Sequence, residues 1–187
     1  KRLNTKSVVA YADRRLKHTL AKRCIAEAVS NLIPNGASLT LNIGTTTEIV
    51  AEALRFHNDL TVISNNINIV QIMRASRLKN LVLIGGEVRL ADGAVIGEDA
   101  IKSISNFKVD FAIIGASSID LDGSILDFDQ REVAVSRAIL ENARSKILVA
   151  DVSKFNVSAH VKICEVKDLD YVILNAPPPQ SFETALQ

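Results

Sequence analysis

The sequence predicts an α/β fold: a Rossmann-like, mostly parallel sheet with helices on both faces. Six short segments rich in Ile, Val and Leu recur along the 187 residues, and amphipathic segments of helical period separate them. Near-continuous apolar runs are typical of strands buried on both faces, as in parallel sheets covered by helices. Repeated alternation of strand and helix is typical of a doubly wound sheet. The length suits one domain with a sizeable core, and this core is aliphatic because only 4% of the residues are aromatic.

The predicted elements follow one another in a regular order. The strands span residues 38–43, 60–64, 80–84, 109–115, 146–150 and 171–174. The helices span residues 20–32, 49–54, 67–73, 100–104 and 130–144. We place Cys24 on the buried stripe of the first helix, which Pro34-Asn35-Gly36 ends.

Three segments interrupt this alternation. Residues 87–97 carry Asp92-Gly93 between short strand-like runs, which predicts a β-hairpin. Residues 120–127 carry Asp122-Gly123 and predict a turn. Three consecutive prolines at 177–179 are expected to end the domain, because proline continues neither a strand nor a helix easily.

Composition excludes several classes of protein. A hydrophobic content of 48% excludes disorder for most of the chain. Two cysteines exclude a disulfide scaffold and indicate a reducing compartment. No apolar run approaches the roughly 18 residues of a membrane span, and the histidines and cysteines lack the spacing of metal ligands. We therefore expect no membrane segment, no metal and no cofactor.

The formal net charge of +1 hides an uneven distribution. Residues 1–23 hold eight basic residues and one acidic residue, whereas the rest of the chain holds 14 basic and 20 acidic residues. Such a basic leading segment is either a site for an anionic partner or a solvated arm. The chain begins with Lys1 rather than Met, as expected of a piece of a longer protein.

The loop after the first predicted strand is a candidate anion site. It reads Asn42-Ile43-Gly44-Thr45-Thr46-Thr47 and opens a predicted helix. Backbone N–H groups at a helix N-terminus attract a phosphate, and threonine hydroxyls add donors. The carboxyl ends of strands are also where open α/β sheets bind ligands. The competing interpretation is ordinary capping of the helix by a threonine.

The next two predicted strands also end in small or polar residues. Asn65 and Asn66 follow the second strand, where asparagine either caps a helix or bonds a ligand hydroxyl. Gly85 and Gly86 follow the third, where glycine allows either a close approach of a ligand or a turn into the hairpin. Three successive strand ends of this kind predict a cleft.

Later segments supply charged candidates. Glu132 either orients a polyol hydroxyl or acts as a base, or it forms a capping box with Asp129, from which it has the matching spacing. Arg131 either pairs with a phosphate or is solvated. Lys154, just after the fifth strand, either pairs with a phosphate as a point charge or lies on a surface loop.

The order of these motifs resembles the C-terminal sensor domain of DeoR-type bacterial transcriptional regulators, over roughly residues 10–180. The matching pieces are Arg14, Lys22-x-x-Ile25-Ala26, Gly44-Thr45-Thr46, Thr61-Val62, Asn65-Asn66, Gly85-Gly86-Glu87, Gly97, Asp110, Gly115, Asp122-Gly123, Glu132 and Asp151-x-Ser153-Lys154-Phe155. Further segments at 34–36, 92–98, 128–133, 137–142 and 176–179 narrow the resemblance to the family's glycerol-3-phosphate regulators.

The resemblance implies the fold of ribose-5-phosphate isomerase and an effector-binding domain that is not an enzyme and has no catalytic residue. It implies a small phosphorylated sugar or polyol, such as glycerol 3-phosphate, held by the residues singled out above. These are Asn42, Gly44, Thr45, Thr46, Thr47, Asn65, Asn66, Gly85, Gly86, Asp129, Arg131, Glu132 and Lys154. Many members carry Asp where this chain has Asn42, which puts any role for a base at that position in doubt.

The resemblance also implies a bacterial, cytoplasmic homo-oligomer that contacts DNA only through a helix-turn-helix domain absent from this chain. The expected organisation is a basic linker remnant at 1–15, the sensor domain at 16–180 and a tail at 181–187. One alternative is a sugar-phosphate isomerase of the same fold, with Asp120, Glu132 and Lys154 as acid, base and phosphate clamp. A second alternative is a scaffold domain with an empty cleft.

Overall fold

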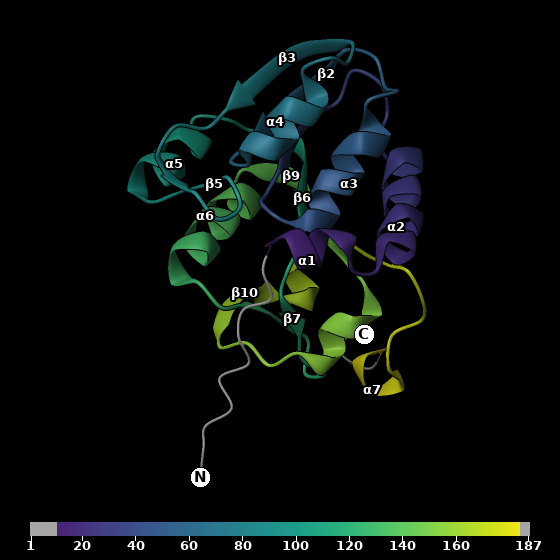
Figure 1. The fold of residues 1–187 in the computed structure, drawn as a ribbon. Helices are drawn as coiled ribbons and strands as arrows, with labels where there is room; N and C mark the ends of the chain where they lie inside the picture. Colours follow the sequence, from purple (N-terminus) through teal and green to yellow (C-terminus); the bar gives the residue numbers. More distant parts are fainter. Residues whose placement is uncertain (1–10, 184–187) are drawn as a thin grey trace.

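The structure is a computed structural model that describes residues 11–183, and residues 1–10 and 184–187 lie outside the described part. A six-stranded parallel sheet forms its centre (Figure 1). Its strands, in spatial order, are β11 (Tyr171–Leu174), β9 (Ala143–Ala150), β6 (Val109–Ile114), β1 (Ser38–Leu41), β2 (Leu60–Ser64) and β3 (Leu78–Leu83). All six predicted strands are confirmed, with ends that differ by up to three residues.

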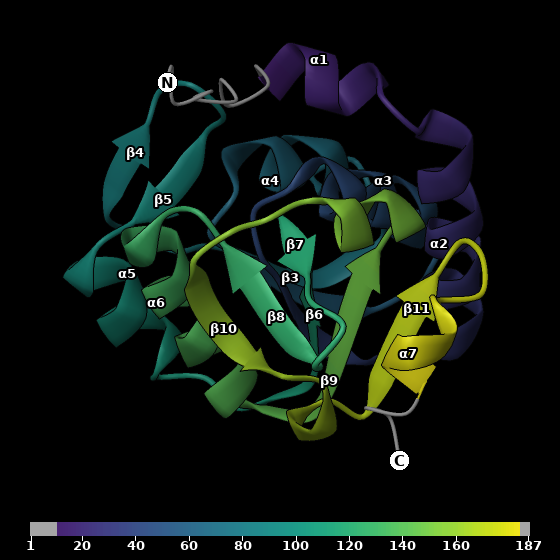
Figure 2. The same cartoon turned by 90° about the horizontal axis from the view of Figure 1, so that it is seen from below.

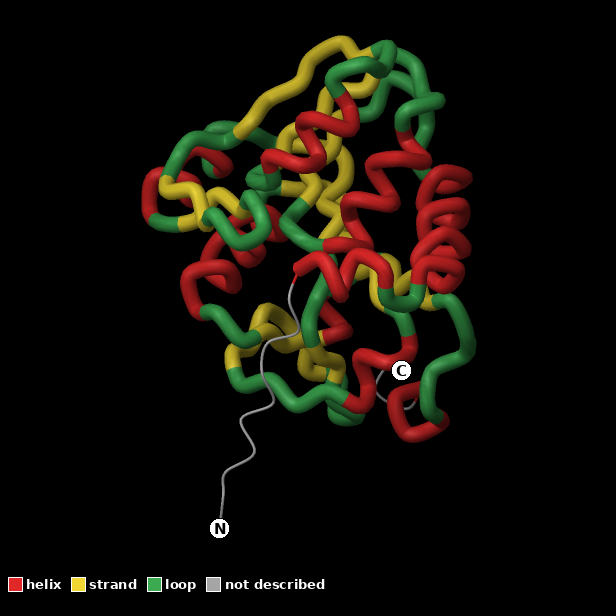
Figure 3. Tube along the Cα trace, viewed as in Figure 1, coloured by secondary structure: helices red, strands yellow, loops and turns green. Residues whose placement is uncertain are grey.

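Helices cover both faces of this sheet (Figures 1 and 3). One face packs against α2 (Thr19–Leu32), α3 (Thr45–Leu54) and α4 (Ile67–Met73), and the other against α5 (Glu98–Ile104) and α6 (Gln130–Glu141). Because side chains alternate along a strand, Ile113 belongs to the first core while its neighbours Ala112 and Ile114 belong to the second. All these strand residues are therefore apolar, which explains the continuous runs in the sequence.

The order of the strands defines where a ligand site is expected. From β1 the chain proceeds to β2 and β3 on one side, and it later places β6, β9 and β11 on the other side. The direction of winding therefore reverses between β1 and β6. Ligands of open α/β sheets bind in the crevice at such a reversal, beyond the carboxyl ends of the strands.

Two small antiparallel sheets flank this crevice (Figure 2). The predicted hairpin at 87–97 is confirmed as β4 (Glu87–Arg89) and β5 (Ala94–Ile96). Of the predicted turn at 120–127, the first four residues join β7 (Ser118–Ile119) to β8 (Ser124–Asp127), and the last four are β8 itself. The third strand of that sheet, β10 (Val161–Glu165), was not predicted. Of its five residues only Ile163 is buried, and its pairing with β8 shifts in register between Lys162 and Cys164, so the sequence shows no clear strand pattern.

Both ends of the domain differ from the prediction. Residues 11–15 were assigned to a linker, but they form most of α1 (Tyr11–Leu16), which lies across the crevice (Figures 1 and 2). Residues 181–183 were assigned to a tail, but α7 (Gln180–Glu183) buries Phe182 completely in the core. The proline run does not end the domain, because proline fits well immediately before and within the first turn of a helix.

The placement of Cys24 in the core was wrong. Cys24 is exposed, and α2 buries Lys22, Ile25, Ala26 and Val29 instead. Apolar residues of this helix lie at helical spacing on two adjacent faces, and only the packing of α3 decides which face is covered. Among residues 11–183, no helix has both the length and the apolar character needed to cross a membrane.

Candidate functional site

The loop between β1 and α3 lies at the reversal point between β1 and β6. Its first residue, Asn42, is 2% exposed. The Asn42 Oδ1 accepts a hydrogen bond from the N–H of Gly115 at 2.9 Å, and its Nδ2 lies 3.3 Å from the Gly115 carbonyl and 3.2 Å from the Ser136 Oγ. Asn42 therefore connects β1 to β6 and α6, and both ends of its amide bond to the protein.

The start of α3 carries backbone N–H groups that have no helical acceptor. Gly44 is the N-cap residue, has φ 148° and makes no side-chain cap, so capping by a threonine does not occur at this position. The Thr47 Oγ1 lies 2.9 Å from the carbonyls of both Asn42 and Gly44 and holds the loop from inside. Glu48 makes the first helical hydrogen bond, to the Gly44 carbonyl, so the preceding N–H groups of Thr45, Thr46 and Thr47 have no helical acceptor. These groups, with the positive end of the helix dipole, suit an anion.

Lys154 is the predicted cation of the site. It lies in a short 3-10 helix, η1 (Val152–Asn156), after β9 and is partly buried. Burial lowers the pKa of its ammonium group, and the nearby Asp151 carboxylate opposes that effect. Lys154 takes part in none of the ion pairs formed within residues 11–183. A partly desolvated cation without an ion-pair partner is a favourable contact for an anion.

The residues after β2 and β3 mainly support the hairpin. Asn66 caps α4 by accepting from the N–H of Asn68 at 2.9 Å, which confirms the capping interpretation for this asparagine. Asn65 donates to the Val95 carbonyl at 3.0 Å, while its Oδ1 is buried without a partner. Gly86 has φ 151°, and a Cβ there would lie 3.0 Å from the Ile96 carbonyl, so this glycine allows the turn into the hairpin. Nothing lies within 4 Å of a Cβ built on Gly85.

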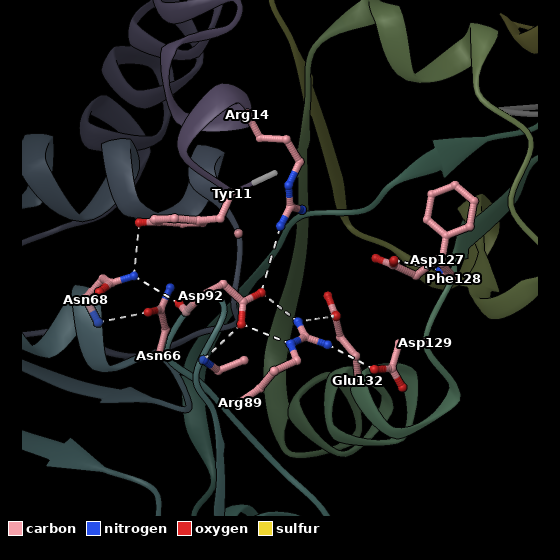
Figure 4. Close-up of polar contacts among 12 residues, drawn as sticks. Tyr11, Arg14, Asn66, Asn68, Arg89, Asp92, Asp127, Phe128, Asp129 and Glu132 are labelled. Atoms are coloured by element: carbon pink, nitrogen blue, oxygen red, sulfur yellow. Dashed lines mark hydrogen bonds and ion pairs between the residues drawn. The ribbon is translucent and has the colours of Figure 1, made fainter. Parts of the chain in front are cut away.

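Arg89 of β4, which was not predicted as a site residue, organises the acidic side of the crevice (Figure 4). Its guanidinium binds Asp92 at 2.7 Å, Asp129 at 2.9 Å and Glu132 at 2.9 Å. Asp129 also caps α6 by accepting from the N–H of Arg131. Glu132 occupies the third position of α6 but binds Arg89 instead of completing a capping box. Arg131 is exposed and pairs with Glu87 at 2.5 Å.

Glu132 has an unusual protonation equilibrium. Burial and the charge of the buried Asp127 raise its pKa from 4.5 to about 7, although Arg89 acts in the opposite direction. The Arg89 charge is shared with Asp92 and Asp129, which weakens its effect on Glu132. Near neutral pH, Glu132 is therefore able either to accept a hydrogen bond from a hydroxyl group or to donate one to it.

This shift predicts a pH-dependent stability. Because the folded state binds the Glu132 proton more tightly than the unfolded state, the free energy of unfolding falls as the pH rises from 4.5 through 7. Glu132→Gln removes this loss. The free energy of unfolding of the variant, relative to that of the original protein, should therefore rise by about 2–3 kcal/mol as the pH rises from 4.5 through 7. Urea denaturation at pH 4.5, 6 and 8 measures the effect. E141Q, at an exposed position of the same helix, is the matched variant. If the free energy of unfolding depends on pH in the same way in both variants, the raised pKa of Glu132 is contradicted.

α1 closes the site from above, since the pocket lies between this helix and the carboxyl ends of the strands. The pocket encloses about 10 Å³ and is lined by Tyr11, Arg14, Ile43, Gly44, Thr45, Glu48, Asp92 and Glu132. Of the predicted residues, the structure thus brings Gly44, Thr45 and Glu132 to this pocket. Asp120, the acid of the isomerase alternative, is exposed in the turn between β7 and β8.

Glu48 anchors the roof of the pocket and was also missed in the sequence. It is 1% exposed and accepts hydrogen bonds from the Tyr11 hydroxyl at 2.6 Å and from Asn66 and Asn68 at 3.1 Å and 3.0 Å. The Tyr11 hydroxyl in turn accepts from Asn68 (Figure 4). A glutamate on an amphipathic helix is expected in solvent, so only the contacts with α1 and α4 reveal its position.

Comparisons with known proteins agree with this geometry. Residues 17–176 match the family model for the DeoR C terminal sensor domain. The glycerol-3-phosphate regulon repressor of Haemophilus influenzae is 46% identical over 168 residues, which are 90% of this chain and 66% of that protein. The protein of the same name from Escherichia coli is 44% identical over 174 residues, which are 93% of this chain and 69% of that protein. The chain spans about two thirds of the length of these curated relatives, which are named as repressors and not as enzymes.

Solved structures agree on the fold. The tetrameric eIF2B-beta2-delta2 complex from C. thermophilum aligns with a TM-score of 0.62 at 16% identity and covers 88% of this chain and 58% of that chain. A D-ribose-5-phosphate isomerase in complex with phospho-erythronic acid aligns with a TM-score of 0.52 at 14% identity, over 72% and 52% of the two chains. At such identities the likeness shows the fold alone, and it confirms the predicted fold class.

Proposed function

We propose, since the chain belongs to the DeoR family of transcriptional regulators through their C-terminal sensor domain, that its pocket binds a small phosphorylated polyol or sugar as effector. Glycerol 3-phosphate is the first candidate, because two relatives at 44–46% identity carry that compound in their names. In the whole protein, the bound effector would modulate DNA binding by a helix-turn-helix domain. A coupling of about 1–3 kcal/mol suffices for such regulation.

The polar groups in and around the pocket, beyond the carboxyl ends of the strands, support this proposal. The backbone N–H groups at the start of α3, at Thr45 and Thr46, suit the three oxygens of a phosphate. Lys154, partly buried and without an ion-pair partner in the described residues, adds a positive charge. Glu132 and Asp127 supply acceptors for hydroxyl groups. N–H donors and a cation for an anion, together with acceptors for hydroxyl groups, suit a polyol phosphate.

Ligand-dependent thermal unfolding tests the proposal. Glycerol 3-phosphate at a hundred times its Kd should stabilise the domain by about 2.7 kcal/mol, whereas glycerol at the same concentration should not. No turnover of ribose 5-phosphate should accompany binding. If no member of a panel of polyol and sugar phosphates shifts the unfolding midpoint at millimolar concentration, the proposal is wrong.

Substitution of the predicted cation provides a second test. Lys154→Ala should weaken glycerol 3-phosphate binding by roughly 10- to 100-fold in calorimetry, because a hydrogen bond between charged groups is lost. Lys167→Ala, at an exposed lysine of η2 (Val166–Asp168), is the matched control and should leave the affinity unchanged. Equal affinities of the two variants would remove Lys154 from the site.

The predicted homo-oligomer belongs to the same proposal. Analytical ultracentrifugation of the 187-residue chain, with and without glycerol 3-phosphate, tests whether this domain self-associates.

A further inference from the structure

A surface groove runs between α2 and α3, which lie side by side at one edge of the molecule (Figure 1). The groove has a volume of about 360 Å³, whereas the pocket beyond the strands has about 10 Å³, and the two share no lining residue. The nearly buried Ile49 of α3 gives the groove an apolar wall, and Arg23 and Glu27 of α2 border it. The groove is therefore a separate feature, which the binding of an effector does not use.

Two large apolar side chains are exposed on this side of the molecule. Phe56, just after α3, is 88% exposed, and Leu20, in the first turn of α2, is 78% exposed. The backbone at Phe56 is fixed, because the next residue, His57, places its Nε2 3.1 Å from the Ser30 carbonyl and 2.9 Å from the Ile33 carbonyl. Phe56 therefore lies beside Ser30, near the carboxyl end of α2. An aromatic side chain on a fixed backbone loses little freedom on contact, as is typical of the anchors of protein interfaces.

Two opposite charges accompany these apolar side chains. Arg23 and Glu27 are exposed and lie one helical turn apart, and neither joins an ion pair within residues 11–183. A surface that presents the same two charges in the reverse order complements both of them. A second copy of this chain, rotated by 180°, is such a surface.

The positions of these residues along α2 agree with a single two-fold axis. The midpoint between Arg23 and Glu27 falls at residue 25. Rotation by 180° about an axis at this level places Arg23 of one copy opposite Glu27 of the other. Phe56 is level with position 30, so Phe56 and Leu20 are equally far from the same axis, and the rotation places Phe56 of one copy against Leu20 of the other. A face that complements itself in both charge and apolar contact suits a second copy of the chain.

We propose that the α2–α3 face, formed by Leu20, Arg23, Glu27 and Phe56 around the groove, joins two copies of this chain with their α2 helices antiparallel. This inference deepens the self-association named in the proposed function by assigning its surface, and it does not depend on the effector. Helices of 14 and 10 residues that pack about 9 Å apart form a face of roughly 400 Å² per copy, at the low end for a specific interface. The dimer is therefore expected to dissociate at micromolar concentration.

Sedimentation equilibrium of the 187-residue chain provides the first test. Phe56→Asp should raise the dissociation constant of the dimer roughly 30- to 1000-fold, because a charge replaces an aromatic anchor. Leu90→Asp, at a hairpin side chain that is 93% exposed, is the matched control and should leave the constant unchanged. If the unsubstituted chain is monomeric at every concentration, or if the two variants dimerise equally, the inference is wrong.

Charge reversal tests the two-fold arrangement and keeps the apolar contacts. Arg23→Glu gives both positions a negative charge, and Glu27→Arg gives both a positive charge. Each variant alone should dimerise roughly 10- to 100-fold more weakly, because like charges then face each other. An equimolar mixture should form a heterodimer with nearly the affinity of the unsubstituted chain. A role within one copy is not restored by mixing, so a mixture that sediments like the separate variants would overturn the arrangement.

Calorimetry with glycerol 3-phosphate separates this inference from the effector site. Phe56→Asp should bind the ligand as the unsubstituted chain does, because the groove and the pocket share no lining residue. Ligand binding by a strictly monomeric chain would overturn the interface and leave the effector site intact. Dimerisation without ligand binding would do the reverse.

Discussion

Phe182→Ala should destabilise the domain by about 3–5 kcal/mol, the cost of truncating a buried aromatic side chain. Phe182 is fully buried and meets the ring of Phe155 edge to face, with ring centroids 4.9 Å apart. In a domain of this size such a loss lowers the unfolding temperature by roughly 6–20 °C. Urea denaturation followed by circular dichroism measures the free energy directly.

The matched variant is Phe56→Ala, because Phe56 is 88% exposed and its ring contributes little to the core. Its free energy of unfolding should change by no more than about 0.5 kcal/mol. If Phe182→Ala behaves like Phe56→Ala, α7 is not part of the cooperative unit and the domain ends before it.

Arg89→Met should destabilise the domain by about 2–4 kcal/mol at pH 8. The substitution leaves Asp92, Asp129 and Glu132 without their shared cation, and removal of one partner from a buried charge cluster costs more than the pair contributes. The expected cost lies below that of a fully buried pair, because the Arg89 side chain is 27% exposed. Arg131→Ala, which breaks the exposed pair with Glu87, should leave the stability nearly unchanged.

The destabilisation by Arg89→Met should depend on pH. Without Arg89 the negative charge of this cluster is uncompensated, and Glu132, whose pKa is raised to about 7, gains its charge between pH 5 and pH 8, so the loss of stability grows as the pH rises. Denaturation curves at pH 5 and pH 8 should show a smaller loss at pH 5. A loss that is the same at both pH values would mean that Arg89 stabilises the hairpin by packing rather than by charge.

Much of the fold was predictable because its causes are local. Strands β1, β2 and β6 supply apolar side chains to the cores on both faces of the sheet, so Ile, Val and Leu dominate them, and this appears directly in the sequence. The hairpin at Asp92-Gly93 follows from turn chemistry within four residues. β10 and α1 were missed, because a five-residue strand and a six-residue helix without a buried face leave no periodic pattern.

The candidate site was predictable only in part. Gly44 and Thr45 were identified because a helix start after a buried strand is a local feature. Asn42 and Asn66 were also proposed, but their amides bond to the protein, to Gly115 and to Glu48 respectively. Whether a polar side chain faces a pocket or a neighbouring strand depends on contacts that no sequence window contains.

By itself, the sequence determined the class of the fold and located the start of α3 after a buried strand as a candidate anion site, since both depend on residues a few positions apart. The tertiary structure decided which charges meet there. Tyr11 reaches Glu48 across 37 positions, and Arg89 reaches Glu132 across 43. The physical reason is that charge and burial act through space, so a lysine such as Lys22 becomes a buried cation only when two helices pack around it. The leading segment, basic in composition, thereby becomes the roof of the site.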